Sequence, residues 1–296
     1  FVYWGHRATG ADHRDDVLAS GAAVELLHTF ALIHDDIMDR SARRRGRPTA
    51  HRSLAAAYAA EGLTGEPGRF GLGGAILAGD LAFVWADQLL DALDLPANAA
   101  RRARGVFTEL RIEVMAGQYL DLRLAGLAAA SEADSMQVAL LKSGRYTVTR
   151  PLQLGAAIGG GDGRLDAALC AFGDALGVAF QLRDDVLGLF GEPASTGKGA
   201  LEDLREGKRT LLMLRAFELA APGQRAELAA ILGNPDVGES EVGRAQRIVA
   251  DCGALDSVER TVAEQQERAR GALAPVDPPA REALEQLADL AVFRVG

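Results

Sequence analysis

Apolar residues recur along most of the chain at the three-to-four-residue spacing typical of helices that bury one face. The longest such patterns predict helices over residues 17–33, 70–93, 98–122 and 165–189. Shorter helices are expected over 51–60, 210–220, 224–232, 239–252, 255–273 and 280–291, and Ser131 is suited to cap one more that meets Pro151. Clusters of Gly and Pro at 61–68, 159–163 and 188–199 predict loops, the last of them a mobile flap.

The residue types that fill these patterns favour an all-α protein. Ala, Leu, Arg and Glu dominate, whereas alternating β-branched residues and Asn-Gly hairpin turns are nearly absent. With 296 residues, 48% of them hydrophobic, the chain is long enough for a substantial core. Neither a shift in composition nor a repeat of fixed period marks a boundary, so we expect one helical domain over residues 1–296.

Charge and cysteine content exclude several classes of protein. The net charge of -9 argues against nucleic acid as a partner, because that binding needs a basic surface. Cys170 and Cys252 lie far apart without metal-binding spacing and suit a reducing cytoplasm. No uninterrupted run of 18 apolar residues exists, so no transmembrane helix is expected. The chain opens at Phe1 without Met or a signal-peptide pattern, and we expect an N-terminal segment to be missing.

Three aspartates end the first long apolar pattern, in Asp35-Asp36-Ile37-Met38-Asp39. On a helix, Asp35 and Asp39 lie one turn apart on the same face, with Asp36 to the side. Like charges at this spacing repel each other, so a cation should lie between them. Carboxylates without Cys or His favour Mg²⁺, with Mn²⁺ as a substitute. For such a motif taken alone, a solvated helix end is the alternative.

A second aspartate pair, Asp184-Asp185, ends the apolar pattern over 165–189. Basic residues follow both motifs: Arg43, Arg44, Arg45 and Arg47 after the first, and Lys198 and Lys208 after the second. An arginine guanidinium group can bind two phosphate oxygens at once. A run of arginines is, however, also typical of a solvated surface or a nucleic-acid patch. Two acidic motifs, each followed by basic residues, suit a metal-bound polyanion such as a diphosphate.

The two motifs together resemble those of the trans-isoprenyl diphosphate synthase, or polyprenyl synthetase, family, and most of all a bacterial geranylgeranyl diphosphate synthase. The resemblance covers nearly the whole chain and is strongest over residues 25–49 and 180–210. It implies a single-domain helical bundle of the isoprenoid synthase type, with the motifs facing each other across a central cavity. It also implies an Mg²⁺-dependent, homodimeric prenyltransferase that joins isopentenyl diphosphate to an allylic diphosphate.

For the first motif, the resemblance implies that Asp35, Asp36 and Asp39 bind metal. Arg44 would bind the allylic diphosphate and Arg45 the isopentenyl diphosphate. A polar residue two helical turns before the motif, here His28, contacts isopentenyl diphosphate in the family. The alternative for this histidine is an ordinary position in the core.

For the second motif, the resemblance implies that Asp184 and Asp185 bind metal. Lys142 and Ser143 would contact the allylic diphosphate and stabilise the departing pyrophosphate, although a lysine in a helix is more often exposed to solvent. The remaining residues that match the family's catalytic site are Gln181, Lys198 and Lys208. For Asp203, Gln118 and Asp121, structural hydrogen bonding is as good an interpretation as metal contact.

Phe30 bears on the length of the product. It lies five positions before Asp35, roughly 6 to 8 Å along the helix, where a growing apolar tail would meet it. In the family, an aromatic residue here, followed by a small one such as Ala31, resembles synthases that make geranylgeranyl diphosphate. We therefore expect a C20 product, with C15 second, although Phe30 would also suit the core.

The sequence departs from the family pattern at two places, and four alternative functions are compared with it. The second motif ends in Gly188 where the family commonly has Asp, and the family's Gly-Lys-x-x-Arg segment is absent. A farnesyl diphosphate synthase and a non-catalytic partner subunit are the alternatives, although the first motif is intact. A terpene cyclase would normally carry an Asn/Ser/Glu metal triad, and a helical nucleic-acid binder fits only the arginine cluster.

Overall fold

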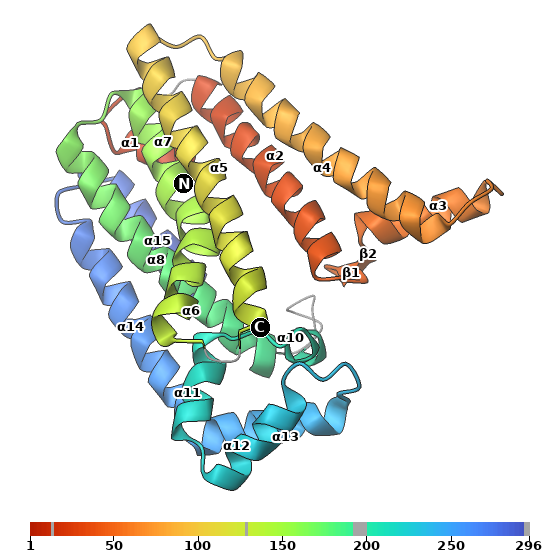
Figure 1. The fold of residues 1–296 in the computed structure, drawn as a ribbon. Coiled ribbons are helices and arrows are strands. Elements are labelled where there is room, and N and C mark those ends of the chain that lie inside the picture. Colours follow the sequence, from red (N-terminus) through yellow and green to blue (C-terminus); the bar gives the residue numbers. More distant parts are fainter. Residues whose placement is uncertain (13–14, 128–129, 192–199, 293–296) are drawn as a thin grey trace. The chain divides into compact units, whose positions relative to one another are not determined.

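The computed structural model describes residues 1–12, 15–127, 130–191 and 200–292, most of them in helices (Figure 1). The chain forms two compact units, one spanning Arg14–Leu95 and the other Phe1–His13 with Pro96–Gly296. The predicted all-α fold class is confirmed. A single domain with a central cavity stays a prediction, and each unit has its own packing.

The Arg14–Leu95 unit consists of three helices and a short hairpin. These elements are α2 (Asp15–Met38), β1 (Arg43–Arg44), β2 (Arg47–Pro48), α3 (Ala50–Ala60) and α4 (Pro67–Asp91). α4 packs along both α2 and α3. Apart from Leu90 at its end, its buried residues are small and recur every three or four positions: Gly71, Ala75, Gly79, Ala82 and Ala86. Residues at this spacing share one face of a helix, so α4 lets its neighbours approach closely.

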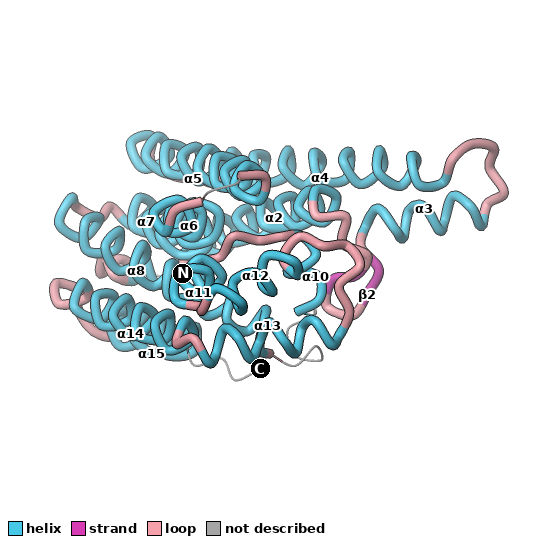
Figure 2. Tube along the Cα trace, turned by 60° about the horizontal axis from the view of Figure 1, so that its bottom comes forward, coloured by secondary structure: helices cyan, strands magenta, loops and turns pink. Residues whose placement is uncertain are grey.

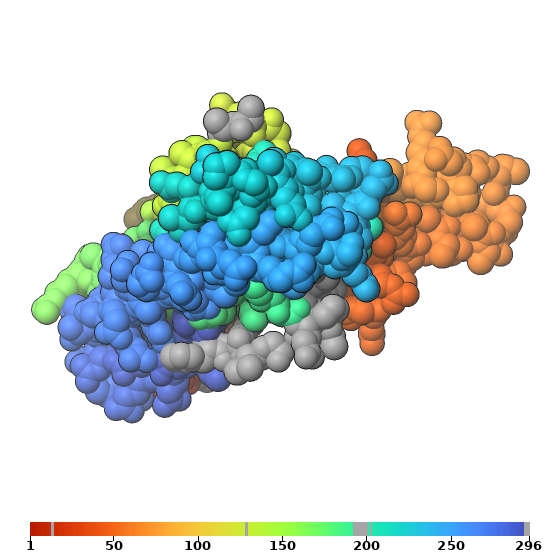
Figure 3. Space-filling model, turned by 90° about the horizontal axis from the view of Figure 1, so that it is seen from below, coloured from red at the N-terminus to blue at the C-terminus, as the bar shows by residue number. Residues whose placement is uncertain are grey.

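The other unit is larger. Its elements are α1 (Val2–Arg7), α5 (Ala97–Ala125), α6 (Glu132–Val138), the π-helix η1 (Ala139–Thr149), α7 (Arg150–Gly159), α8 (Gly163–Phe190), α10 (Ala200–Glu206), α11 (Leu211–Leu219), α12 (Pro222–Ile231), α13 (Glu239–Asp251), α14 (Ala254–Ala272) and α15 (Ala280–Val292). α8 is the core helix, packed against η1, α7 and α14 (Figures 1 and 2). α11, α12 and α13 pack together and cover one face of this unit, seen in teal to blue in Figure 3.

The π-helix η1 packs against α5 and α8 at very short range. A Cβ atom at Gly117 of α5 would lie 2.3 Å from the backbone nitrogen of Lys142 in η1. A Cβ atom at Gly177 of α8 would lie 2.2 Å from the Cα atom of Gly144. Both glycines therefore let rigid helices clamp η1, which carries Lys142 and Ser143.

Several elements differ from the sequence prediction. The helix expected from Ser131 onward is divided into α6, η1 and α7, because a π-helical stretch interrupts the regular spacing. α1 and α10 have only six and seven residues, too few to show a periodic apolar pattern. The hairpin was missed because its turn is Arg45-Gly46 rather than Asn-Gly.

The expectation of no transmembrane helix is not supported by length and composition. Among the described residues, three helices are long and apolar enough to cross a membrane: α2, α4 and α8. Our expectation counted uninterrupted apolar runs, whereas an 18-residue window with up to two charges meets this looser criterion. In α8, 56% of that window is buried inside the protein, in keeping with its place in the core.

Candidate active site

A tight hairpin follows α2 and brings Arg44 back to the end of that helix. Its two turn residues, Arg45 and Gly46, have φ angles of 50° and 74°, and a two-residue turn of type I′ needs both to be positive. Thr49 closes the hairpin by donating a hydrogen bond of 2.9 Å to the Ser41 carbonyl. The left-handed conformation is uncommon for arginine, so the chain holds Arg45 at the tip under strain.

Arg44 binds two aspartates of the first motif. Its Nε atom lies 2.9 and 3.0 Å from the two carboxylate oxygens of Asp36, and its Nη2 atom lies 3.1 Å from Oδ2 of Asp35. Asp36 is only 4% exposed, so its charge needs such a partner. Burial alone would lower the pKa of Arg44, but the hydrogen bonds and charges of Asp36 and Asp35 raise it above its ordinary value. An arginine of the chain thus places positive charge beside Asp35 and Asp36, while the cation expected between Asp35 and Asp39 stays a prediction.

His28 and Phe30 lie on α2 in the two turns before the aspartates. Burial lowers the pKa of His28, and the charges of Arg45 and Arg44 lower it further, while Glu25 opposes the shift. His28 is therefore a neutral hydrogen-bonding group at neutral pH. The ring of Phe30 contacts Phe83 of α4 edge to face, with ring centres 5.0 Å apart.

In the larger unit, a chain of hydrogen bonds joins η1 to the second motif. The Ser143 hydroxyl donates to Oε1 of Gln181, and the Gln181 amide donates to Oδ1 of Asp185 over 2.7 Å. Gln181 and Asp185 are one turn apart on α8. Three residues that the sequence singled out are therefore in direct contact, whereas Asp184 is exposed.

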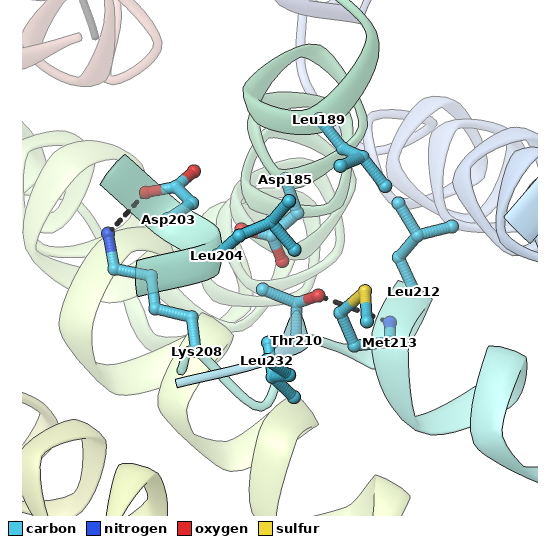
Figure 4. Close-up of a pocket in the computed structure, with 9 residues that line it drawn as sticks. All are labelled: Asp185, Leu189, Asp203, Leu204, Lys208, Thr210, Leu212, Met213 and Leu232. Atoms are coloured by element: carbon cyan, nitrogen blue, oxygen red, sulfur yellow. Dashed lines mark hydrogen bonds and ion pairs between the residues drawn. The ribbon is translucent and has the colours of Figure 1, made fainter. Parts of the chain in front are cut away.

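Asp185 also lines a small pocket with Asp203 and Lys208 (Figure 4). The cavity has a volume of about 20 Å³, enough for one water molecule. Burial raises the pKa of Asp185 to about 8; the Gln181 hydrogen bond opposes this shift, and the charges of Asp184 and Asp203 reinforce it. At neutral pH this carboxyl group ionises readily only if a further positive charge comes close.

Lys208 is held by two carboxylates of its own segment. Its Nζ atom lies 2.8 Å from Oδ1 of Asp203 and 3.0 Å from Oε2 of Glu206. The other oxygen of Asp203 lies where a larger residue at position 188 would project, 2.5 Å from the place of a Cβ atom on Gly188. Gly188, which departs from the family pattern, therefore makes room for the Asp203 carboxylate.

Lys142 of η1 forms an ion pair with Asp121 of α5, with Nζ and Oδ2 2.6 Å apart. Both side chains are about 23% exposed, so this lysine is neither free in solvent nor fully buried. The pair fixes Lys142 on the α5 side of η1, while the neighbouring Ser143 bonds to α8.

Buried charges behind η1 were missed at the level of sequence. Glu113 of α5 accepts hydrogen bonds of 2.7 Å from Arg145 and from Arg150, and Arg145 also donates to Asp174 of α8 over 3.0 Å. Thr149 donates to Asp174 over 2.8 Å. Charged residues inside apolar helical patterns could have predicted this network, because a charged side chain is buried in a helix core only when it has a charged partner.

A family model described as polyprenyl synthetase matches residues 1–249. The chain belongs to the polyprenyl synthetase family. A relative, the geranylfarnesyl diphosphate synthase of Aeropyrum pernix, is 35% identical over 280 residues, which cover 93% of this chain and 81% of that protein. The geranylgeranyl diphosphate synthase of Mycobacterium tuberculosis is 34% identical over 288 residues, covering 97% of this chain and 77% of that one.

A solved structure shares the fold of this polyprenyl synthetase. It is the geranylgeranyl pyrophosphate synthase of Corynebacterium glutamicum, crystallised with isoprenyl diphosphate and magnesium. It matches with a TM-score of 0.95 and 38% identity, covering 99% of this chain and 85% of that one. The predicted isoprenoid synthase fold is confirmed, and the family assignment makes the chain a prenyltransferase.

Among the described residues, no three carboxylate, histidine or cysteine side chains converge on a common point for a metal ion. The donors of both motifs are carboxylates, however, which suits Mg²⁺, and the Arg44 ion pair marks a position for positive charge beside Asp35 and Asp36. The assigned roles of the site residues stay predictions, and Lys198 lies outside the described residues.

Proposed function

We propose that this prenyltransferase joins isopentenyl diphosphate to an allylic diphosphate primer of 5 to 15 carbons and releases geranylgeranyl diphosphate. The observation that carries the proposal is the hydrogen-bonded chain from Ser143 through Gln181 to Asp185. It links a hydroxyl suited to a diphosphate with a carboxyl group suited to a metal, and it lies next to Lys142. Relatives named geranylgeranyl diphosphate synthase support the product.

In this proposal the first motif binds substrate diphosphates. Asp35, Asp36 and Asp39 would hold Mg²⁺, and Mn²⁺ would be a substitute. Arg44 is already charged and lies against these carboxylates, so it can transfer its donors to phosphate oxygens of the allylic substrate. Arg45 and the neutral His28 would bind isopentenyl diphosphate.

The second motif would serve the same leaving group. Asp184 and Asp185 would hold Mg²⁺, and the bound cations would neutralise charge that builds up on the diphosphate. Lys142, Ser143, Lys198 and Lys208 would donate to the pyrophosphate oxygens. Asp121 and Asp203 position Lys142 and Lys208, respectively, because each carboxylate holds the lysine ammonium group within 2.8 Å.

The reaction needs no protein nucleophile. The allylic C–O bond breaks, and its electron pair leaves with pyrophosphate, which the lysines and Arg44 hold. The double bond of isopentenyl diphosphate then attacks the resonance-stabilised allylic cation, and a proton is lost to the pyrophosphate. The carbonyl oxygen of Gln181 accepts from Ser143, so the amide is oriented with its oxygen toward η1.

Phe30 would set the length of the product by blocking the growing apolar tail. Its edge-to-face contact with Phe83 gives the ring a partner on α4 within the same unit. A ring at this place favours C20, with C15 as the second choice.

The test is an incubation of the purified protein with Mg²⁺, isopentenyl diphosphate and each of the C5, C10 and C15 primers. Chromatography of the products should show mainly C20 chains. A main product of C15 would identify a farnesyl diphosphate synthase instead. Absence of turnover with every primer would favour the non-catalytic subunit.

We further propose that the protein acts as a homodimer in the cytoplasm. Four large apolar side chains of α5 recur every three or four residues and are between 45% and 66% exposed: Ile112, Met115, Tyr119 and Leu122. The family resemblance implies a homodimer, and in this proposal a second copy covers the stripe. Both cysteines, Cys170 and Cys252, are free thiols, which suits a reducing compartment.

A further inference from the structure

His34 of α2 holds an unusual position for a residue next to the aspartate motif. Its Nε2 atom lies 3.1 Å from the backbone carbonyl oxygen of Ile76 in α4 and 3.7 Å from Oδ1 of Asp80. Its ring also contacts Phe30, one helical turn earlier, with ring centres 4.7 Å apart and planes at 63°. The imidazole is thus bound to α4 at its tip and to the Phe30 ring at its side.

Gly79 makes this position possible. A Cβ atom at residue 79 would lie 2.3 Å from Nε2 and 2.5 Å from Cδ2 of His34. The imidazole therefore rests on the bare backbone of α4, in space that any other residue at 79 would fill. His34 can lie there only because α4 has no side chain at this point.

The Phe30 ring consequently has an aromatic partner on each of two helices. Phe83 of α4 contacts it at 5.0 Å and His34 of α2 at 4.7 Å, both with planes at 63°. Edge-to-face contacts of this kind favour one ring orientation over the others. Because His34 is itself fixed by the Ile76 carbonyl, it restricts the rotation of Phe30.

We propose that His34 is a positioning residue for product length, which acts by fixing the Phe30 ring across the path of the growing prenyl chain. The inference rests on the proposed function, since it requires that Phe30 stops that chain. His34 touches neither diphosphate in this account. Its loss should lengthen the product, because a freely rotating Phe30 ring lets additional five-carbon units pass.

The first experiment measures the product distribution of His34→Ala with a C15 primer, Mg²⁺ and excess isopentenyl diphosphate. Loss of one edge-to-face contact should raise the ratio of longer chains to C20 by roughly three- to tenfold. Thr29→Ala is the matched control, because Thr29 is exposed on the same helix and its hydroxyl donates to the carbonyl of Glu25 in its own helix. The control should keep the wild-type distribution.

Gly79→Ala provides an independent test that leaves His34 in the chain. The Cβ atom of the new alanine would occupy the place of the imidazole tip, so the His34 side chain must move. The backbone of α4 can stay where it is, because the three atoms nearest to the Cβ atom are all side-chain atoms of His34. The product chains should lengthen as in His34→Ala. This variant therefore tests the role of His34 even if His34→Ala fails to fold, as judged by thermal unfolding.

The double variant Phe30→Ala/His34→Ala separates positioning from a direct effect. Since His34 acts through Phe30, the double variant should give the same distribution as Phe30→Ala alone. An unchanged or shortened product in folded His34→Ala and Gly79→Ala, or additive lengthening in the double variant, would overturn the inference. Absence of turnover by the wild-type protein would instead refute the proposed function.

Discussion

The absence of a side chain at Gly188, near the end of α8, leaves room for the carboxylate of Asp203. An oxygen of Asp203 lies 2.5 Å from where a side chain on residue 188 would begin, while its other oxygen binds Lys208. The second motif has no carboxylate at position 188, and Asp203 of α10 places its own carboxylate beside that position. The sequence showed the departure at Gly188 but not the neighbour that fills its place, because the two residues meet only in the folded chain.

Gly188→Asp should therefore lower stability in the absence of metal. The new carboxylate would crowd that of Asp203 and repel it, at a cost of about 1–3 kcal/mol. Urea unfolding in the presence of a chelator measures this cost. Gly188→Asp/Asp203→Asn should recover most of the loss, whereas an unfolding free energy equal to that of wild type in the single variant would contradict the account.

Glu113 should give stability a distinct dependence on pH. Burial alone would raise the pKa of Glu113, but the hydrogen bonds from Arg150 and Arg145 lower it below its ordinary value of 4.5. A carboxyl group with a lowered pKa stabilises the fold above its unfolded pKa and loses that contribution as pH falls through its folded pKa. Glu113→Gln should thus cost about 3 kcal/mol at pH 7.

The cost of Glu113→Gln should shrink below about pH 4.5 and vanish once wild-type Glu113 is itself protonated. Denaturant titrations of both proteins at a series of pH values would show this convergence. A cost that stays constant down to pH 3 would mean that the ionic network contributes nothing through the charge of Glu113.

At the scale of elements, long helices were predictable and short irregular ones were not. The repeating apolar pattern indicated α2, α4, α5 and α8 to within a few residues, since each buries a continuous face over many turns. The π-helix η1 left no periodic signal, and its clamps at Gly117 and Gly177 depend on how close three helices approach. The residues of both aspartate motifs could be predicted as a candidate site from their charges, whereas the Arg44 ion pair depends on the hairpin turn at Arg45-Gly46.

That turn leads to a prediction about strain in the hairpin. Arg45 has a φ of 50°, which glycine adopts without cost, so Arg45→Gly should raise the unfolding free energy by about 1 kcal/mol. The same change should weaken binding of isopentenyl diphosphate, because the proposed phosphate contact is lost. Chemical denaturation together with the KM for isopentenyl diphosphate tests both effects. An increase in stability with an unchanged KM would remove Arg45 from the substrate site.

At the scale of the whole molecule, each of the two compact units carries one aspartate motif. The match to residues 1–249 spans both motifs, so a single reaction should depend on both. The exposed apolar stripe of α5 is the surface that we propose a second copy of the chain covers.

Charges placed in that stripe should separate the proposed dimer. Ile112→Glu/Tyr119→Glu puts two carboxylates among side chains that are 57% and 66% exposed, so the monomer itself should fold normally. Analytical ultracentrifugation should change from a dimer in wild type to a monomer in the variant. A wild-type protein that sediments as a monomer would refute the assembly.

The central claim is that both aspartate motifs serve one metal-dependent condensation, and release of pyrophosphate tests it most directly. With Mg²⁺, isopentenyl diphosphate and a C15 primer, the protein should release one pyrophosphate for each isopentenyl unit added. Asp35→Asn and Asp184→Asn should each lower this rate by at least about a hundredfold, while Thr29→Ala should not. Wild-type rates in either aspartate variant, or equal rates with a chelator in place of Mg²⁺, would contradict the account.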